Sequence, residues 1–293
     1  VFVGAHVGIS LLAVFGAWRT TDPTATAGTE AGTGTGPGTA VRTRTSPGSG
    51  ATTGPRRAAI LRTAGSPRTA GSPRTAAGTV VLINPNTSAA TTAMMTAIAR
   101  RALGPAHPVR GVTVARGPRM LTDPAALRAA APEVLAAGAA AAGGDCAALL
   151  VAAFGDPGLA ALRAATGLPV AGLGEAALLE AAADGAPFGI ATTTPLLADA
   201  ITARVAELGL SDRYTGLRLT AGVPERLSAD PAVLLDRLER AVRACAERDG
   251  ARTVVIGGGP LGEAAEELGA RCAVRIVAPI PAACRSLARL LTE

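Results

Sequence analysis

The stretch LLVAAFGDPGL, at positions 149–159, predicts how the chain folds. The apolar run at 149–153 is typical of a strand buried on both faces, and FGDPG then ends it before a helix that begins near Leu159. In open α/β sheets, ligand sites form at the carboxyl ends of parallel strands. We therefore expect a site at this junction, although Ala153, which ends the strand, has no reactive side chain.

Three other apolar runs also stop at polar or glycine-rich sequence. VVLI at 80–83 is followed by NPNTS, FGIA at 188–191 by TTTP, and TVVI at 253–256 by GGGPL. Shorter runs at 168–172 and 274–277 complete a series of strands that alternates with helical segments. This alternation predicts a parallel α/β architecture. Because the order of the junctions repeats, we expect two related halves whose four strand ends surround one cleft.

Composition divides the chain into a low-complexity segment and two predicted domains. Residues 1–78 are rich in Thr, Gly, Ala, Pro, Ser and Arg and contain RTAGSP twice in succession. Such a composition buries too little apolar surface to offset chain entropy, so we expect a disordered tail. We expect a first α/β domain at 79–184, which the chain rejoins at 273–293, and a second at 185–272.

The net charge of +6 comes from the N-terminal segment. Residues 1–78 contain eight Arg and two acidic residues, whereas residues 79–293 contain 20 Arg and 20 acidic residues. The predicted folded part is therefore neutral, and we expect no nucleic-acid partner. The apolar stretch at 1–18 leaves a signal peptide or membrane anchor open, but glycines interrupt it and no basic residue precedes it, so we expect no membrane association. Because the sequence begins with Val1, we expect a fragment or a start site placed too far upstream.

The cysteines do not form a metal-binding or disulfide pattern. The chain has four cysteines at scattered spacings, two histidines and no CxxC motif. We therefore expect no metal site and a reducing, cytoplasmic location. Cys245 falls on the apolar stripe of a helix that begins at 230–231, which favours packing over catalysis.

The polar strand ends offer groups that suit a carboxylate or an imide. NPNTS provides amides and hydroxyls beside the free N–H groups of a helix, and we favour this binding role over the alternative of a turn with side-chain hydrogen bonds. TTTP provides hydroxyls, or a helix cap, at the matching place, and GGGPL lets the backbone approach a ligand closely. We expect the substrate-binding residues to be Asn84, Ser88, Thr192, Thr193, Gly257 and Gly259. If the Asn84 amide binds a ligand, Asn84→Ala should weaken binding and leave the fold intact.

Two carboxylates near the strand ends are weak candidates for acid–base catalysis. Asp156 precedes a proline, and its side chain could instead orient the loop by accepting hydrogen bonds from backbone N–H groups, which we favour. Glu175 follows the short strand at 168–172. No residue pattern assigns a catalytic role to either of them.

Four motifs together resemble a known family. INPNTS, AFGDPGL, PVAGLGEAA and GGGPL, in that order over residues 79–293, are similar to the hydantoin racemase branch of the Asp/Glu racemase superfamily. The resemblance implies two pseudo-symmetric flavodoxin-like domains with the active site between them. It also implies that no cofactor or metal takes part.

The chain departs from this family at the catalytic positions. In catalytic members one cysteine from each half faces the substrate carbon, so that one thiolate removes a proton and the other thiol delivers one to the opposite face. The matching positions here are Ala153 and Gly258. Cys146 lies seven residues before Ala153, over 20 Å away along an extended strand at about 3.3 Å per residue, and does not replace the first thiol.

The resemblance predicts a cofactor-independent racemase or isomerase of an amino acid or hydantoin-type derivative. The expected partner is a small molecule with a carboxylate or an imide, and a homo-oligomer is left open. Because both thiols are missing, two alternatives remain: a binding protein that does not racemise its ligand, or another carbon-acid enzyme such as a decarboxylase.

Overall fold

Two parallel β-sheets of four strands organise residues 78–293, which are the residues that the computed structural model describes. The first sheet contains β1 (Thr79–Asn84), β2 (Val109–Thr113), β3 (Cys146–Val151) and β4 (Val170–Gly172). The second sheet contains β5 (Phe188–Thr192), β6 (Tyr214–Leu219), β7 (Thr253–Ile256) and β8 (Arg275–Val277). The predicted parallel α/β architecture is confirmed.

The two sheets have the same strand order. It is β2-β1-β3-β4 in the first sheet and β6-β5-β7-β8 in the second, with all neighbours parallel. In this flavodoxin-like order the chain reverses direction across the sheet between the first and third strands, and ligands bind at the carboxyl ends of those strands. The fold therefore points to the ends of β1 and β3 in one half, and of β5 and β7 in the other.

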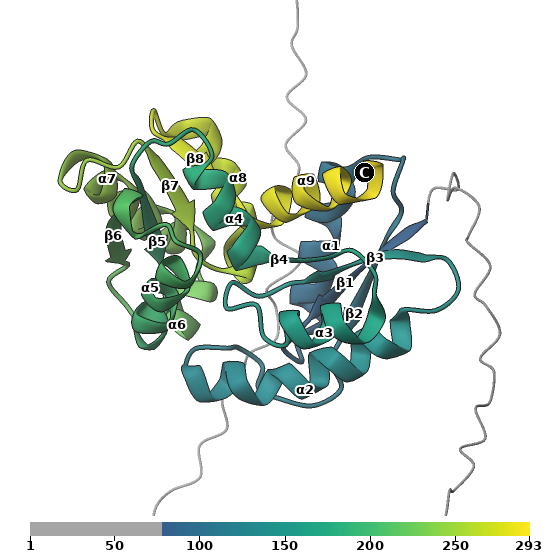
Figure 1. The fold of residues 1–293 in the computed structure, drawn as a ribbon. Helices are drawn as coiled ribbons and strands as arrows, with labels where there is room; N and C mark the ends of the chain where they lie inside the picture. Colours follow the sequence, from purple (N-terminus) through teal and green to yellow (C-terminus); the bar gives the residue numbers. More distant parts are fainter. Residues whose placement is uncertain (1–77) are drawn as a thin grey trace, which may run out of the picture. The chain divides into compact units, whose positions relative to one another are not determined.

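Helices cover both faces of each sheet (Figure 1). The α-helices are α1 (Ala89–Leu103), α2 (Pro124–Ala141), α3 (Leu159–Thr166), α4 (Leu173–Ala182), α5 (Ala198–Glu207), α6 (Pro224–Ser228), α7 (Pro231–Glu247), α8 (Gly262–Arg271) and α9 (Pro279–Thr292). Short 3₁₀ turns are η1 (Pro195–Leu197), η2 (Ser211–Arg213) and η3 (Gly259–Leu261). Helices α1 and α9 pack on one face of the first sheet, and α2 and α3 on the other. In the second sheet α4 and α5 lie opposite α7 and α8.

Side-chain caps mark the starts of three helices. Ser88 accepts a hydrogen bond from the Thr91 backbone N–H at the start of α1. Asp123 and Asp230 cap α2 and α7 in the same way, and a proline follows each of them at the first helical position. These side chains pair N–H groups that the helix itself leaves without partners, which fixes where each helix begins.

Two strands were not predicted by the hydrophobic pattern. β2 and β6 are edge strands whose residues are mostly half-buried, and both contain a glycine and an arginine. A continuous apolar run indicates a strand that is covered on both faces. An edge strand with mixed composition gives no such run.

The C-terminal segment joins both halves. β8 pairs with β7 in the second sheet, whereas α9 packs on α1 and α4 and carries buried residues into the core beside the first sheet. The domain limits of 79–184, 185–272 and 273–293 stay a proposal. We place the return to the first half after Val277, because the strand before it belongs to the second sheet.

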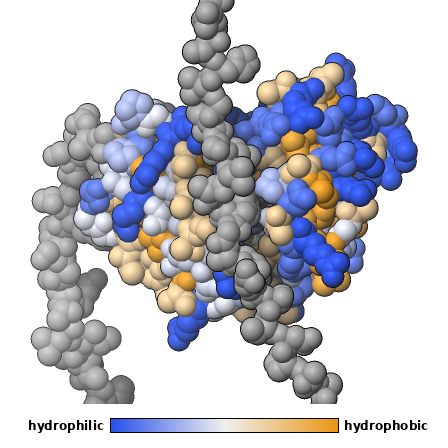
Figure 2. All heavy atoms as spheres, turned by 180° about the vertical axis from the view of Figure 1, so that it is seen from behind, coloured by the Kyte–Doolittle hydropathy of each residue, from blue (hydrophilic) through white to orange (hydrophobic). Residues whose placement is uncertain are grey.

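The surface of residues 78–293 is mixed in character. Figure 2 shows hydrophilic and apolar side chains interspersed over the face that it presents. The large apolar side chains that are exposed are Leu179, Leu196, Leu219, Val223, Val233 and Leu290. No helix within residues 78–293 has the length and apolar character needed to cross a bilayer. The predictions for residues 1–77, the disordered tail and the apolar stretch at its start, lie outside the described residues.

Candidate active site

A cavity of about 240 Å³ lies at the carboxyl ends of four strands. Segments that follow β1, β3, β5 and β7 all contribute to its wall, as the strand order predicts. A cavity of this volume has room for several waters or for one small molecule. The residues that line it are Asn86, Met120, Leu121, Leu127, Ala152, Ala153, Phe154, Gly155, Leu178, Thr193, Thr194, Leu197, Ala200, Ile201, Arg204, Glu207, Ser228, Gly257, Gly258, Gly259, Pro260 and Leu261.

Ala153 and Gly258 occupy equivalent places in the two halves. The Ala152 N–H donates to the carbonyl of Ile83 on β1 at 2.8 Å, and the Gly257 N–H donates to the carbonyl of Ala191 on β5 at 2.8 Å. Each bond continues the pairing of the two strands by one residue beyond the last paired residues of the sheet. Ala153 and Gly258, which come next, therefore have the same position relative to their sheets. Both Ala153 and Gly258 line the cavity.

Asn84 is buried and does not line the cavity. Its side-chain Nδ2 lies 2.9 Å from Asn86 Oδ1, 3.1 Å from the Ser88 carbonyl and 3.0 Å from Thr92 Oγ1, and its Oδ1 accepts from the Asn86 N–H. The side chain is fully buried. Its hydrogen-bonding groups are therefore used within the NPNTS loop, and Asn84 shapes that loop. Direct contact between Asn84 and a ligand stays a prediction that this geometry disfavours.

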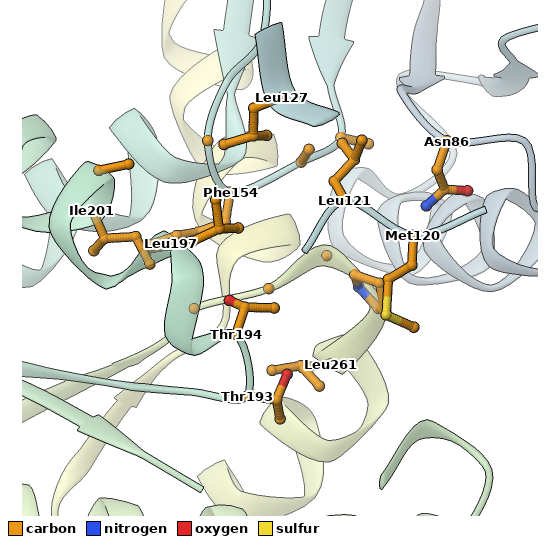
Figure 3. Close-up of a pocket in the computed structure, with 18 of the residues that line it drawn as sticks. Asn86, Met120, Leu121, Leu127, Phe154, Thr193, Thr194, Leu197, Ile201 and Leu261 are labelled. Carbon is orange, nitrogen blue, oxygen red and sulfur yellow. The ribbon is translucent and has the colours of Figure 1, made fainter. Parts of the chain in front are cut away.

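Asn86, in contrast, lines the cavity and has a donor to offer. Its Oδ1 accepts from the Ser88 backbone N–H at 2.9 Å and from Asn84 Nδ2 at 2.9 Å. Since a backbone N–H can only donate, the atom beside it is the oxygen, and the amide orientation is fixed. Figure 3 shows the nitrogen end of the amide on the side of Met120. Asn86 thus presents an N–H donor where the sequence predicted Asn84 and Ser88; the Ser88 hydroxyl instead caps α1.

The three threonines at the end of β5 have two roles: Thr192 stabilises the strand end, and Thr193 and Thr194 line the cavity. The Thr192 hydroxyl donates to the Gly257 carbonyl at 2.6 Å and lies 3.2 Å from the Thr194 hydroxyl. Thr192 is fully buried and ties the end of β5 to the glycine loop, whereas Thr193 and Thr194 line the cavity. The alternative role as a helix cap is not realised through a side chain, because Thr194 precedes η1 without a capping hydrogen bond.

The glycine loop brings backbone close to the first half. A Cβ on Gly259 would lie 3.0 Å from Met95 Sδ and 3.1 Å from the Ala152 carbonyl oxygen, so the absence of a side chain permits this approach. Gly257 and Gly259 both line the cavity, as does Gly258. Their contact with a ligand stays a prediction.

Asp156 holds the loop after β3 against the start of α4. Its carboxylate accepts hydrogen bonds from the Gly174 N–H at 2.9 Å and from the Glu175 N–H at 2.6 Å. Burial raises the pKa of Asp156 to about 7, although the two N–H bonds and Arg204 act to lower it. A pKa near 7 would suit a general base, but both oxygens are engaged and Asp156 does not line the cavity. The orienting role favoured from the sequence is the one that the geometry supports.

Glu175 lies between two arginines. Arg163 reaches its Oε1 at 2.6 Å, and Arg204 reaches its Oε2 at 2.7 Å. Burial alone would raise the pKa of Glu175, but the hydrogen bonds and charges of both arginines outweigh it and lower the pKa. A carboxylate stabilised in its charged form is a poor base, and Glu175 does not line the cavity.

The four cysteines do not contribute to the cavity wall. Cys146, Cys245 and Cys284 are buried. Burial raises the pKa of Cys245 to about 11 and that of Cys284 to about 12, so both remain thiols at neutral pH. Cys245 lies on the buried stripe of α7, as predicted. Within residues 78–293 no three His, Cys, Asp or Glu side chains gather in a way that could hold a metal ion.

The apolar wall of the cavity was not predicted from the sequence. Leu127, Leu178 and Ile201 come from α2, α4 and α5, and Met120 and Leu121 come from the loop before α2. On a helix, an apolar residue that faces a cavity has the same spacing as one that faces the core. No signal in the sequence separates the two.

Comparison with known proteins identifies the family. The sequence model described as Asp/Glu/Hydantoin racemase matches residues 80–287. The hydantoin racemase of Paenarthrobacter aurescens is 27% identical over 209 residues, which cover 70% of this chain and 88% of that protein.

Two solved structures are similar as well. The allantoin racemase from Klebsiella pneumoniae has a TM-score of 0.69 at 27% identity and covers 73% of this chain and 88% of its own. The allantoin racemase from Pseudomonas fluorescens has a TM-score of 0.67 at 25% identity, and the match covers 72% of this chain and 91% of that protein. The matched region contains both sheets and all four strand ends that form the cavity, and the chain belongs to the Asp/Glu/hydantoin racemase family.

Proposed function

We propose that the chain is a cofactor-independent racemase or isomerase of an amino acid or hydantoin-type derivative. Membership of the Asp/Glu/hydantoin racemase family and the similarity to hydantoin and allantoin racemases support this function. The observation that carries the proposal is the symmetric cavity, in which equivalent strand ends of the two halves meet. A molecule held there has one half of the protein on each face, which is the arrangement that inversion at a carbon requires.

The polar lining would hold the carbonyl oxygens next to the reacting carbon. Asn86 offers an amide N–H, and Thr193 and Thr194 offer hydroxyl groups on another side of the cavity. Donors fixed at the oxygen that gains charge stabilise an enolate and so make the neighbouring C–H more acidic. Thr192 and Asn84 would act by positioning these lining groups.

Ala153 and Gly258 cannot move a proton, so we assign that task to water in the cavity. The volume of about 240 Å³ admits water beside a small ligand. A positioned acid or base contributes roughly 10²–10⁴-fold to a rate. We therefore expect catalysis by enolate stabilisation that is slower than with positioned thiols at these two places.

Deuterium exchange tests this function directly. The full chain should exchange the α-hydrogen of one enantiomer of a 5-substituted hydantoin for deuterium from D₂O faster than buffer alone. Loss of optical rotation should accompany the exchange, because water can return the deuteron to either face. Proton NMR and polarimetry on the same samples measure the two rates.

The exchange experiment also separates the alternatives. Binding without exchange would refute the racemase and would indicate a binding protein. Exchange without loss of optical rotation would indicate proton return to one face only. Loss of carbon dioxide from a malonate-type substrate, without racemisation of hydantoins, would indicate a decarboxylase.

Substitutions in the NPNTS loop should distinguish the structural role of Asn84 from the ligand-binding role of Asn86. Asn84→Ala should lower the free energy of unfolding by about 1–3 kcal/mol, because it leaves buried hydrogen-bonding groups unpaired. This differs from the sequence-based expectation of an intact fold, since Asn84 proves fully buried with its amide in use.

Asn86→Asp is the change to compare with Asn84→Ala. It keeps the Oδ1 acceptor and removes the amide donor on the cavity side. We expect ligand affinity to fall by about 1–3 kcal/mol or more, with a smaller effect on stability than Asn84→Ala. Thermal denaturation and titration calorimetry measure the two effects. Equal losses of affinity in both variants, with no loss of stability in either, would contradict the division of roles.

A further inference from the structure

Glu175 is a charged residue close to the cavity that the proposed chemistry does not use. It lies in the first turn of α4, and its side chain is 18% exposed. Burial acts to raise the pKa of Glu175, but Arg163 and Arg204 outweigh it and lower the pKa, so the group is a carboxylate at neutral pH. Removal of this charge would leave two partly buried guanidinium groups without their shared partner.

The two ion pairs of Glu175 connect helices of both halves. Arg163 comes from α3, which packs on the first sheet, and Arg204 comes from α5, which packs on the second. Helix α4 lies between them, because its Leu173 belongs to the core of the first sheet and its Leu178 to the core of the second. One side chain on the connecting helix therefore joins a helix of each half.

The first turn of α4 also holds the loop after β3. The helix has no side-chain cap of its own, and its Gly174 and Glu175 N–H groups donate to the Asp156 carboxylate instead. Asp156 has φ 46°, a left-handed conformation that few residues other than glycine adopt, and these two hydrogen bonds offset its cost. The position of the loop therefore depends on where the first turn of α4 lies.

Both segments that converge on Glu175 form part of the cavity wall. Phe154 of the loop packs in the same apolar cluster as Leu197 and Ile201, and the three lie together on one side of the cavity (Figure 3). A displacement of the first turn of α4 would move both parts of this wall. The lining residues concerned are Ala153, Phe154 and Gly155 of the loop and Ala200, Ile201 and Arg204 of α5.

We infer that Glu175 is a positioning residue that holds the loop after β3 and helix α5 in the arrangement that forms the cavity. It acts on α5 through Arg204, and on the loop through the backbone N–H groups that bind Asp156. Arg163 anchors it to the first half, because the same guanidinium donates to the Val170 carbonyl on β4 at 2.9 Å. This role goes beyond the proposed function, since it concerns the shape of the cavity whatever reaction takes place there.

Glu180 provides a matched control on the same helix. Its side chain is 15% exposed, and its carboxylate lies 2.7 Å from Arg285 and 3.7 Å from Arg275. Neither Glu180 nor its two arginines line the cavity. Glu180→Gln therefore removes the same charge from a similar pair of arginines, and any effect of a general loosening of α4 will appear in both variants.

Hydrogen exchange of backbone N–H groups, measured by mass spectrometry on the full chain, tests the inference without a ligand. Glu175→Gln should accelerate amide exchange about tenfold at 153–159 and at 198–207, because both segments lose a contact that keeps them closed. Glu180→Gln should leave both segments unchanged. Equal acceleration in the two variants, or no acceleration in Glu175→Gln, would overturn the inference.

Changes at Arg204 test the route to α5. If Glu175→Gln does not fold, Arg204→Gln removes the pair to α5 alone, and unchanged amide exchange at 198–207 would then overturn the inference. Where both single variants fold, the double variant should accelerate exchange at 198–207 no more than the larger single change, because both remove one interaction. Fully additive effects would overturn the action of Glu175 through Arg204.

Turnover provides a second measurement, which rests on the proposed function. With 5-benzylhydantoin as the probe, Glu175→Gln should lower kcat for α-hydrogen exchange about tenfold or more and change KM less, because a displaced wall misaligns bound substrate. Glu180→Gln should leave both constants unchanged. A loss of stability alone would reduce the amount of folded protein in both variants without this difference. If the unmodified chain shows no α-hydrogen exchange, the proposed function fails, and the amide exchange still decides the role of Glu175.

Discussion

Gly174→Ala should lower the free energy of unfolding by about 3 kcal/mol, the upper end of what an added buried methyl costs. A Cβ at position 174 would overlap the Phe154 carbonyl oxygen and would lie 3.0 Å from Asp156 Oδ2. The nearer atom belongs to the backbone, so no change of side-chain rotamer can relieve the overlap. The loop after β3 would have to leave α4 and give up the Asp156 hydrogen bonds to the Gly174 and Glu175 N–H groups.

The matched control is Gly269→Ala. Gly269 lies in α8 and is exposed, and a methyl group at this position would have no atom within 4 Å. Alanine there should raise stability by roughly 0.5–1 kcal/mol, because glycine weakens a helix interior. For a folded unit of this size, a loss of about 3 kcal/mol corresponds to a melting temperature about 6–12 °C lower. Thermal denaturation of the two variants beside the unmodified chain measures both effects.

A Gly174→Ala variant that melts like the unmodified chain would show that the loop moves away from α4 at little cost. In that case Asp156 would not fix the position of Ala153, which lies three residues before it. Retained stability combined with lost ligand binding would be informative too, because it would show that the displaced loop enters the cavity.

The buried centre of the fold could be predicted from sequence for a simple physical reason. β1, β3, β5 and β7 are central strands covered by helices on both faces, so their residues form continuous apolar runs, and the polar junctions after them stand out. The edge strands β2 and β6 are exposed along one side, and their mixed composition gives no comparable signal. Helix starts were predictable because the capping side chain acts within its own helix turn.

The candidate site was less predictable from the sequence. Which polar and which apolar residues line the cavity depends on how segments that are distant in the sequence pack together. From the NPNTS sequence alone, either asparagine could face a ligand. In the structure the Ser88 N–H donates to the Asn86 Oδ1, which leaves the Asn86 side-chain nitrogen on the cavity side. The apolar wall of the cavity depends on which residues of α2, α4 and α5 come together at the cavity. Helical spacing shows that Leu127 and Ile201 lie on the buried faces of their helices. It does not show whether each side chain packs against other protein atoms or faces a cavity.

Ala153→Cys with Gly258→Cys should raise the rate of racemisation by about 10²–10⁴-fold, because it adds a positioned base and a positioned acid. The two residues occupy equivalent places at the cavity, so the new thiols enter from the two halves. Gly258 has φ 170°, an extended conformation that any residue adopts. Its Cβ would lie 3.0 Å from Leu261 Cδ1, which is the end of a flexible side chain that can shift by a few tenths of an ångström. Deuterium exchange and polarimetry with a 5-substituted hydantoin measure the gain.

The controls isolate the thiols from other effects of the substitutions. Ala153→Ser with Gly258→Ser adds side chains of similar size that do not ionise at neutral pH, and should bring little gain. Either cysteine alone should accelerate exchange more than inversion, since one face then lacks a proton donor. Alkylation of thiols should abolish the gain in the double variant and leave the activity of the unmodified chain unchanged, because none of its four cysteines lines the cavity. A folded double variant without any gain, or with sulfur atoms more than about 10 Å apart in its crystal structure, would refute the assignment of Ala153 and Gly258 to the two sides of one reacting carbon.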